Sequence, residues 1–256
     1  MSNRALKEKF GIVILLDALG AANFSTQQIK TFLSARAEVN SIVRSLAKTL
    51  PKQIPNGFKR GTPVIFTFGD TLVTTIAIET AAEIPAQITV ALLLMRRYLF
   101  HSLQRGVLFR GSFAIGRYIA DARSNTVMGE AVADAANWYE RADWMGLCAT
   151  PKTCTELEYY LSTTALKRPS VLLPYAVPLK DQTTHELYCV SWPGAFFDEM
   201  LAKSSKESTP RRAFWAILKE LTFPLAATSK YENAKRFFSH VEQQIVNLPV
   251  EPTLPS

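Results

Sequence analysis

The sequence is poor in the residues that bind transition metals or form disulfide bonds. It has three cysteines and three histidines among 256 residues. An odd number of cysteines cannot all pair, and Cys148, Cys154 and Cys189 form no C-x-x-C spacing. We therefore expect reduced thiols, no structural zinc site and a cytoplasmic protein.

Long hydrophobic segments are also missing. The most apolar helix candidate, residues 86–100, holds only the short run ITVALLLM before Arg96 and Arg97. A membrane-spanning helix needs about 20 apolar residues, so this segment is typical of a core helix. The opening segment MSNRALKEKFGIVILLD carries no hydrophobic region that ends in small residues, as a signal peptide would. The sequence predicts no membrane partner.

Charge of one sign is nowhere concentrated. The net charge is +7 and the isoelectric point is near 9.3, yet no run of five like charges occurs. A basic balance suits an anionic partner such as a triphosphate, but it equally fits an ordinary, mildly basic surface. Without a basic block there is no sign of a nucleic-acid-binding tail, and we expect no nucleic acid partner.

The remaining composition is that of a globular protein, with 48% apolar and 20% charged residues. A chain of this length can bury a large core without disulfides or a structural metal. It contains no internal repeat, low-complexity stretch or long linker. One large domain or two small ones would account for it.

The first half of the chain alternates between strand-like and helix-like patterns. An apolar run over residues 11–17 predicts a central strand that ends at Asp17, and residues 26–50 have helical spacing. Residues 62–78 contain two β-rich runs around Gly69-Asp70, which predicts a tight hairpin with Asp70 at its tip. A helix over 81–104 and a strand over 107–121 complete the order.

This β-α-β-β-α-β order predicts an α+β fold with a ferredoxin-like, split βαβ sheet. In that topology the end of the first strand and the tip of the hairpin meet at one edge. We therefore expect Asp17 and Asp70 to lie side by side.

The second half is expected to extend this unit. It should contain a helix over 129–146, a helix over 155–164 and paired strands over 171–179 and 186–192. The last third is predicted to be helical, because Pro210 follows Thr209 at a helix start and Ser229 with Glu232 forms a capping box. The apolar stripe of the last helix comprises Tyr231, Ala234, Phe237, Phe238, Val241 and Ile245.

Two neighbouring carboxylates repel each other unless a cation lies between them, and Mg²⁺ or Mn²⁺ prefers carboxylate oxygens. Two such ions can activate a hydroxyl and hold a leaving phosphate. The small residues after Asp17, Ala18-Leu19-Gly20, allow backbone amides to approach a polyphosphate. Each aspartate alone is more often an ordinary turn or cap residue, so the argument depends on the pair.

In this order the motifs resemble the class III nucleotidyl cyclases over roughly residues 10–155. GIVILLDALGAANFS resembles the first metal strand of that family, and FTFGDTLVTTI resembles its second-metal hairpin. FRGSFAIG and TVMGEAVADAANWYERADWMGLCATPKTC resemble the strand and helix that follow. The resemblance implies a catalytic domain over residues 1–192 with a helical extension, residues 193–256, packed on the same domain.

The chain departs from purine cyclases at the positions that select the base. Phe66 stands where the family has Lys or Glu, and Thr126 stands where it has Asp or Cys. The usual transition-state Asn and Arg are replaced by Ala133 and Asn137. In these departures, and in PYAVPLKD, LYCVSWP and SKYENAKRFF, the chain resembles the bacterial antiphage Pycsar cyclases, which make cyclic UMP or cyclic CMP.

The resemblance implies a homodimer that converts UTP or CTP to the 3′,5′-cyclic nucleotide and pyrophosphate. Asp17, Asp70 and the Ala18 carbonyl would bind two Mg²⁺ or Mn²⁺ ions, while Phe66, Thr126 and the 18–20 turn would contact the nucleotide. Arg110 would bind phosphate or order the aspartates, although an inter-strand salt bridge is an equal expectation. Lys180 is placed where purine cyclases have a phosphate lysine, but a solvated turn lysine is the favoured interpretation.

Three alternatives remain at this stage. The first is a purine cyclase, against which Phe66 argues. The second is a catalytically silent, nucleotide-binding dimer, against which both aspartates argue. The third is a polymerase palm, which should carry a turn other than TFGDT. The sequence identifies neither the choice between UTP and CTP nor the effector that reads the product.

Overall fold

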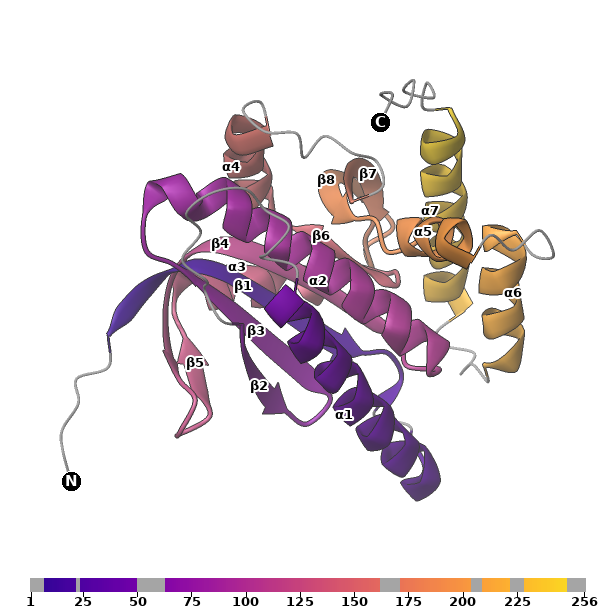
Figure 1. Cartoon of the computed structure of the whole chain (residues 1–256), viewed down its shortest axis with the longest axis horizontal. Coiled ribbons are helices and arrows are strands. Elements are labelled where there is room, and N and C mark those ends of the chain that lie inside the picture. The colour runs from indigo at the N-terminus through magenta and orange to yellow at the C-terminus, as the bar shows by residue number, and fades with distance from the viewer. Residues whose placement is uncertain are drawn as a thin grey trace.

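The computed structural model of the chain describes residues 7–21, 24–49, 63–161, 171–203, 209–221 and 228–247 (Figure 1). Its strands are β1 (Glu8–Ala18), β2 (Val64–Phe68), β3 (Thr71–Ile78), β4 (Phe109–Asp121), β5 (Thr126–Met128), β6 (Gly146–Ala149), β7 (Leu172–Pro178) and β8 (Thr184–Val190). Its helices are α1 (Thr26–Thr49), α2 (Ile84–Gln104), α3 (Glu130–Tyr139), α4 (Pro151–Leu161), α5 (Gly194–Lys203), α6 (Pro210–Glu220) and α7 (Thr228–Val246), with a 3₁₀ turn at Ala81–Glu83.

The strands form a single sheet in the order β2-β3-β1-β4-β6-β8-β7, and β5 pairs with β4 outside this path. The pairs β1–β3, β1–β4 and β2–β3 are antiparallel, so the first four strands have the order of a split βαβ sheet. The predicted α+β, ferredoxin-like β-α-β-β-α-β unit is therefore confirmed. The parallel β4–β6 pair and the antiparallel β8–β7 pair then extend the sheet.

Strand β1 is buried on both faces, as its continuous apolar run predicts. Its even-numbered residues, such as Ile12 and Ile14, belong to a large core under α1 and α2, while Val13 and Leu15 face the other side. Helices α1 and α2 lie in front of the sheet in Figure 1. On the opposite face α3 covers a smaller cluster, which consists of Val13, Leu15, Phe66, Val73, Ala114, Tyr118, Ala131 and Ala135.

A close approach between β1 and β4 fixes their spacing next to Arg110. A Cβ atom on Gly111 would lie 2.2 Å from the Leu15 carbonyl oxygen and 2.7 Å from a Leu16 methyl group. Any larger side chain would therefore have to push the two strands apart.

The C-terminal helices share the large core with the sheet. Trp192, Phe214, Phe237 and Phe238 are buried, and the rings of Phe214 and Phe238 stack at 4.5 Å between centroids. The predicted stripe on α7 is buried from Tyr231 to Val241, with Ile245 partly buried against the same core. The side chain of Arg96 on α2, only 4% exposed, forms an ion pair with Asp198 on α5 at 2.5 Å.

The structure corrects two sequence-based boundaries and adds one strand. The helix expected over 129–146 ends at Tyr139, because the chain turns there toward β6. Ser229 lies inside α7, which begins at Thr228, so it is not the N-cap residue. The short strand β5 was not expected at all. The predicted helix start at Thr209-Pro210 is confirmed, and the Thr209 hydroxyl caps this helix by accepting a hydrogen bond from the Arg212 amide. The last residue of the helix expected over 26–50, the first residue of the hairpin expected over 62–78 and the end of the helix expected over 155–164 lie outside the described residues.

The three cysteines are free thiols, and Cys148 and Cys189 face each other across β6 and β8. Within the described ranges, none of the helices combines the length and the apolarity needed to cross a bilayer.

Candidate functional site

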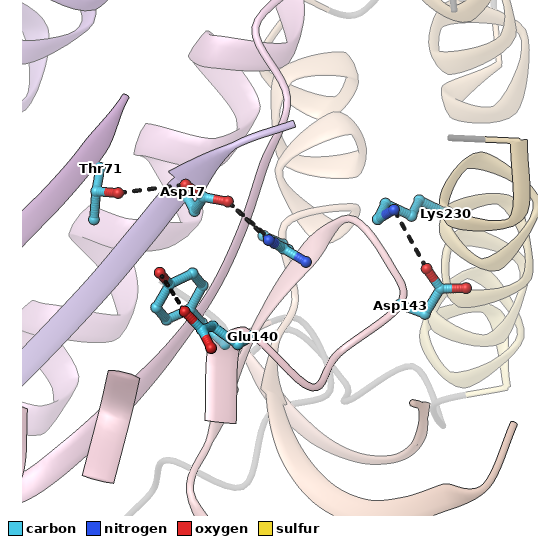
Figure 2. A network of polar contacts seen from close by, with 7 residues as sticks. Asp17, Thr71, Glu140, Asp143 and Lys230 are labelled. Atoms are coloured by element: carbon cyan, nitrogen blue, oxygen red, sulfur yellow. Dashed lines mark hydrogen bonds and ion pairs between the residues drawn. The ribbon is translucent and has the colours of Figure 1, made fainter. Parts of the chain in front are cut away.

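Asp17 lies at the carboxyl end of β1, between β3 and β4. Its register partners are Thr71 on β3 and Arg110 on β4. The Thr71 hydroxyl donates to Oδ1 of Asp17 at 3.3 Å, and Arg110 donates to Oδ2 through Nε at 3.2 Å and Nη2 at 3.0 Å. Figure 2 shows Thr71 beside Asp17, with their hydrogen bond as a dashed line. The strand pairing therefore fixes this carboxylate from both sides.

Asp70 occupies the tip of the β2–β3 hairpin, after Gly69 with its left-handed φ of 61°. The Ala18 amide donates to the Asp70 carbonyl oxygen at 3.3 Å, which ties the hairpin tip to the end of β1. The Arg36 guanidinium of α1 donates to the Gly69 carbonyl at 2.8 Å and supports the turn from the other side. The structure thus brings the two predicted aspartates to one edge of the sheet.

Arg110 forms the inter-strand salt bridge that the sequence left open as one of its two roles. The side chains of Arg110 and Asp17 are 15% and 16% exposed, so this pair is mostly shielded from water. The guanidinium also lies over the ring of Tyr139, 5.6 Å from its centroid, at the end of α3. Arg110 is therefore oriented by a carboxylate on one side and an aromatic ring on the other.

The electrostatics of Asp17 reflect this burial. Desolvation raises the pKa of its carboxyl above the ordinary value, Arg110 opposes the rise, and the nearby charge of Asp70 adds to it. Two carboxylates close enough to repel each other are a place where a cation is favoured.

In the turn after β1, the backbone amides that the sequence offers to a polyphosphate already donate hydrogen bonds within the chain. The Leu19 amide donates to the Leu108 carbonyl at 2.8 Å, in addition to the Ala18–Asp70 bond. A polyphosphate contact through these two amides would require those bonds to open. Gly20 has a left-handed φ of 82°, as a tight turn requires. At the start of α1, Ser25 and Gln28 cap each other.

A cavity of about 510 Å³ lies beside the same turn, lined by Leu19, Gly20, Gln28, Phe32, Leu108 and Tyr231 among others. Asp17, Asp70 and Arg110 do not line it. The carboxylates belong instead to the end of β1 and to the β2–β3 turn, and both residues are partly buried.

The two predicted base-contacting residues lie on neighbouring elements of one chain. Phe66 on β2 is 1% exposed and packs in the smaller cluster under α3. Thr126 starts β5, and its hydroxyl exchanges hydrogen bonds with Ser124. The turn between β4 and β5 reaches β2, where the Asn125 side chain donates to the Thr67 carbonyl at 3.1 Å. Phe66 offers no stacking surface in the single chain, and its contact with a base stays a prediction.

Ala133 and Asn137, which replace the usual transition-state residues, are both exposed on α3. They are four residues apart and therefore share one face of the helix. That face is turned away from the cluster that holds Ala131 and Ala135.

The donor set fits the hard cations that the sequence predicts. Asp17 and Asp70 supply two carboxylates that lie close enough for their charges to interact. Among the described residues there is no group of three or more His, Cys, Asp or Glu side chains that could hold a metal. Mg²⁺ is commonly held by one or two carboxylates and completed by substrate phosphates and water. The pair matches that pattern and does not match a closed structural metal site.

Sequence reasoning missed Thr71 and Tyr139. Thr71 follows Asp70 directly and could have been found from the strand register once β1 and β3 are paired. Tyr139 carries no sequence signal, because its contact with Arg110 depends on how α3 crosses the sheet. Lys180 lies in the β7–β8 turn, and burial together with the charge of Arg110 lowers the pKa of its ammonium group. This turn lysine is therefore close to the site.

Neither a family model nor a curated protein matches the sequence significantly. Solved structures that are similar to the chain include the adenylyl cyclase CyaB from P. aeruginosa, at 12% identity and a TM-score of 0.45, covering 72% of this chain and 94% of that one. Another is the catalytic core of a rhodopsin-guanylyl cyclase with converted specificity, in complex with ATPαS. It has 13% identity and a TM-score of 0.45, and the match covers 73% of this chain and 98% of that one.

The raised pKa of Asp17 predicts a pH dependence of stability in the metal-free chain. Because the folded-state pKa lies above the ordinary value of 3.8, folding penalises the ionised form. Relative to Asp17→Asn, the wild-type free energy of unfolding should fall as pH rises through the interval between the two values, and then stay constant. Urea unfolding from about pH 3 to 7 in the presence of a chelator measures this.

Arg110→Gln serves as the matched variant in that experiment. The Arg110 guanidinium opposes the rise in the Asp17 pKa. Arg110→Gln should therefore show a larger pH-dependent fall in the free energy of unfolding than the wild type. A difference between wild type and Asp17→Asn that does not change with pH would contradict the assignment.

Proposed function

We propose that this chain is a nucleotidyl cyclase that acts on a pyrimidine nucleoside triphosphate. The observation that carries the proposal is the meeting of Asp17 and Asp70 at one edge of a split βαβ sheet, with Arg110 bound to Asp17. The order of motifs along the sequence, which resembles class III cyclases, supports the same assignment.

In the proposed reaction the ribose 3′-hydroxyl loses its proton and its oxygen bonds to the α-phosphorus. The bond from that phosphorus to the bridging oxygen breaks, and pyrophosphate leaves. Asp17 and Asp70, with the Ala18 carbonyl, would hold two Mg²⁺ or Mn²⁺ ions. When bound, these ions lower the pKa of the hydroxyl and neutralise developing charge. The chain itself orients Asp17 through Thr71 and presents Arg110 to the phosphates.

The proposed active unit is a homodimer with shared sites. The exposed face of α3 with Ala133 and Asn137, together with Phe68 at 43% and Met128 at 51% exposure, is available to a second copy. In this arrangement the aspartates come from one chain, and β5 and α3, residues 126–137, come from the other. The absence of an Arg at position 137 leaves more of the charge stabilisation to the metal ions and Arg110.

The choice of a pyrimidine depends on Phe66 and Thr126. Buried Phe66 has no hydrogen-bonding group to match the polar edge of a purine, and it fills the space that a Lys or Glu would use. The Thr126 hydroxyl can donate or accept a hydrogen bond, so it suits the exocyclic group of uracil or cytosine equally. The preference for UTP over CTP, and a role in second-messenger synthesis during antiphage defence, are carried by the Pycsar resemblance alone.

The first test removes each carboxylate. Asp17→Ala and Asp70→Ala should lower turnover by roughly a thousandfold, equivalent to about 4 kcal/mol of transition-state stabilisation, while both variants still fold. Asp17→Ala should also lower the melting temperature, because it leaves the mostly buried Arg110 without its carboxylate partner. Glu8→Ala is the matched control, because Glu8 lies on the same strand and pairs with exposed Arg117 far from the site. Either aspartate variant retaining a near-wild-type rate rules out the two-metal proposal.

The second test concerns the shared site. Asp70→Ala and Asn137→Glu should each be inactive alone, whereas a mixture with exchanged subunits should recover about one quarter of wild-type activity, because half of the dimers then hold one intact site. Subunit exchange is verified with two affinity tags. A mixture that exchanges subunits and stays inactive places all essential residues in one chain.

The third test identifies the base. With equal concentrations of the four nucleoside triphosphates and Mn²⁺, cyclic UMP should exceed cyclic CMP. Both together should exceed the cyclic purine nucleotides by about thirtyfold or more, the effect of roughly 2 kcal/mol from one unmatched polar group. Chromatography of the products measures the ratios. Dominant cyclic AMP or cyclic GMP would falsify the pocket argument, whereas dominant cyclic CMP would change only the choice of pyrimidine.

A further inference from the structure

The loop between α3 and β6, residues 140–145, joins the site to the C-terminal helix α7. It begins directly after Tyr139, whose ring lies under the Arg110 guanidinium. It ends at Met145, before the first residue of β6. The position of this α3–β6 loop therefore affects where Tyr139 stands and how Arg110 is supported.

On one side the α3–β6 loop is joined to the β7–β8 turn. The Asp143 amide donates to the Pro178 carbonyl at 2.9 Å, and the Lys180 amide donates to the Arg141 carbonyl at 2.9 Å. A bridge between Ala142 and Leu179 lies between these bonds. Lys180 thus takes its position from the same loop that supports Arg110.

On the other side the loop is held by α7. The Asn233 side chain, in a residue only 8% exposed, donates to the Asp143 carbonyl at 2.6 Å. The Lys230 ammonium group forms an ion pair with the Asp143 carboxylate at 3.5 Å, and their side chains are 19% and 20% exposed. Next to them, fully buried Trp144 packs edge-on against Phe237 of α7 at 4.9 Å between ring centroids. Figure 2 shows the Lys230–Asp143 contact across from Asp17.

The cations on this side of the site are close to one another. The ammonium group of Lys180 is near enough to Arg110 and Lys230 that both charges, after burial, lower its pKa, while the smaller effects of the Glu140 and Asp143 carboxylates oppose the shift. Two cations held near each other form a place for a polyanion, provided that the backbone keeps them together.

We propose that α7, through Lys230 and Asn233, holds Asp143 so that Arg110 and Lys180 are positioned for the terminal phosphates of the substrate. This inference deepens the proposed function, on which it rests for the identity of the phosphate side. Lys230, Asn233 and Asp143 are positioning residues, since they act through the loop and not on the reacting atoms. In this way the C-terminal helical extension contributes to the geometry of the substrate site.

The test uses pyrophosphate with Mn²⁺ and the full-length chain, with affinity measured by calorimetry. Lys230→Met and Asp143→Asn should each weaken binding by about tenfold, and the double variant should be no worse than either single one, because both break the same contact. Lys235→Met is the matched control, since it removes the same charge from α7 but breaks only an exposed pair with Glu232. Lys230→Arg should retain binding, because arginine can still pair with Asp143.

Asp143→Asn separates positioning from direct binding. Removing its negative charge would tighten pyrophosphate binding if Lys230 itself were the phosphate ligand, or if net charge alone mattered. Weaker binding is therefore the expected result, and unchanged or tighter binding overturns the inference. Equal losses in Lys230→Met and Lys235→Met also overturn it, as does a wild-type chain that does not bind pyrophosphate.

Because pyrophosphate binding is measured without turnover, the two proposals can fail separately. If the wild-type chain forms cyclic nucleotide and the variants bind pyrophosphate like wild type, the function stands and the positioning role is wrong. If no cyclic nucleotide forms but the binding pattern is as expected, the positioning role stands without the proposed reaction. Melting temperatures identify any variant that fails to fold. If Asp143→Asn does not fold, the comparison of Lys230→Met with Lys235→Met decides the test.

Discussion

The ion pair between Asp17 and Arg110 is the interaction on which the organisation of the site depends. It joins two adjacent antiparallel strands at the edge where the β2–β3 hairpin also ends. A mostly buried charge pair is costly unless its geometry is held by the surrounding structure. Here the support comes from Thr71 on one side and Tyr139 on the other, so the ion pair connects the sheet to α3. Gly111, beside Arg110, permits the close approach of β1 and β4 that keeps the pair together.

The same strands explain why one half of the fold could be predicted. A continuous apolar run before Asp17 can only be satisfied by burial on both faces, and the Gly69-Asp70 pair between β-rich runs can only turn. With the intervening helices, these local signals leave one arrangement of four strands, which the structure confirms. The meeting of Asp17 and Asp70 then follows from topology, without any side-chain detail.

Other features depend on contacts that the sequence does not record. The end of α3 at Tyr139 is set by the α3–β6 loop, which follows its hydrogen bonds to the β7–β8 turn instead of continuing the apolar period. Phe66 had a pattern that fits either a pocket wall or a core residue, and only its packing against Val13 and Val73 distinguishes the surroundings. Lys230 and Asn233 are ordinary polar residues of a helix until α7 is placed beside residue 143.

The burial of Trp192, Phe214 and Phe238 in one core with the sheet has a consequence for how this chain can be divided. Deletion of the segment after residue 192 would expose the apolar side chains that pack against it, such as Phe100, Trp144 and Tyr175, and would deprive Arg96 of Asp198. The C-terminal helical segment, residues 193–256, is therefore not a domain that can be transferred to another protein by itself. A fusion protein should keep the sheet and the C-terminal helices together, with no fusion point between β8 and α5.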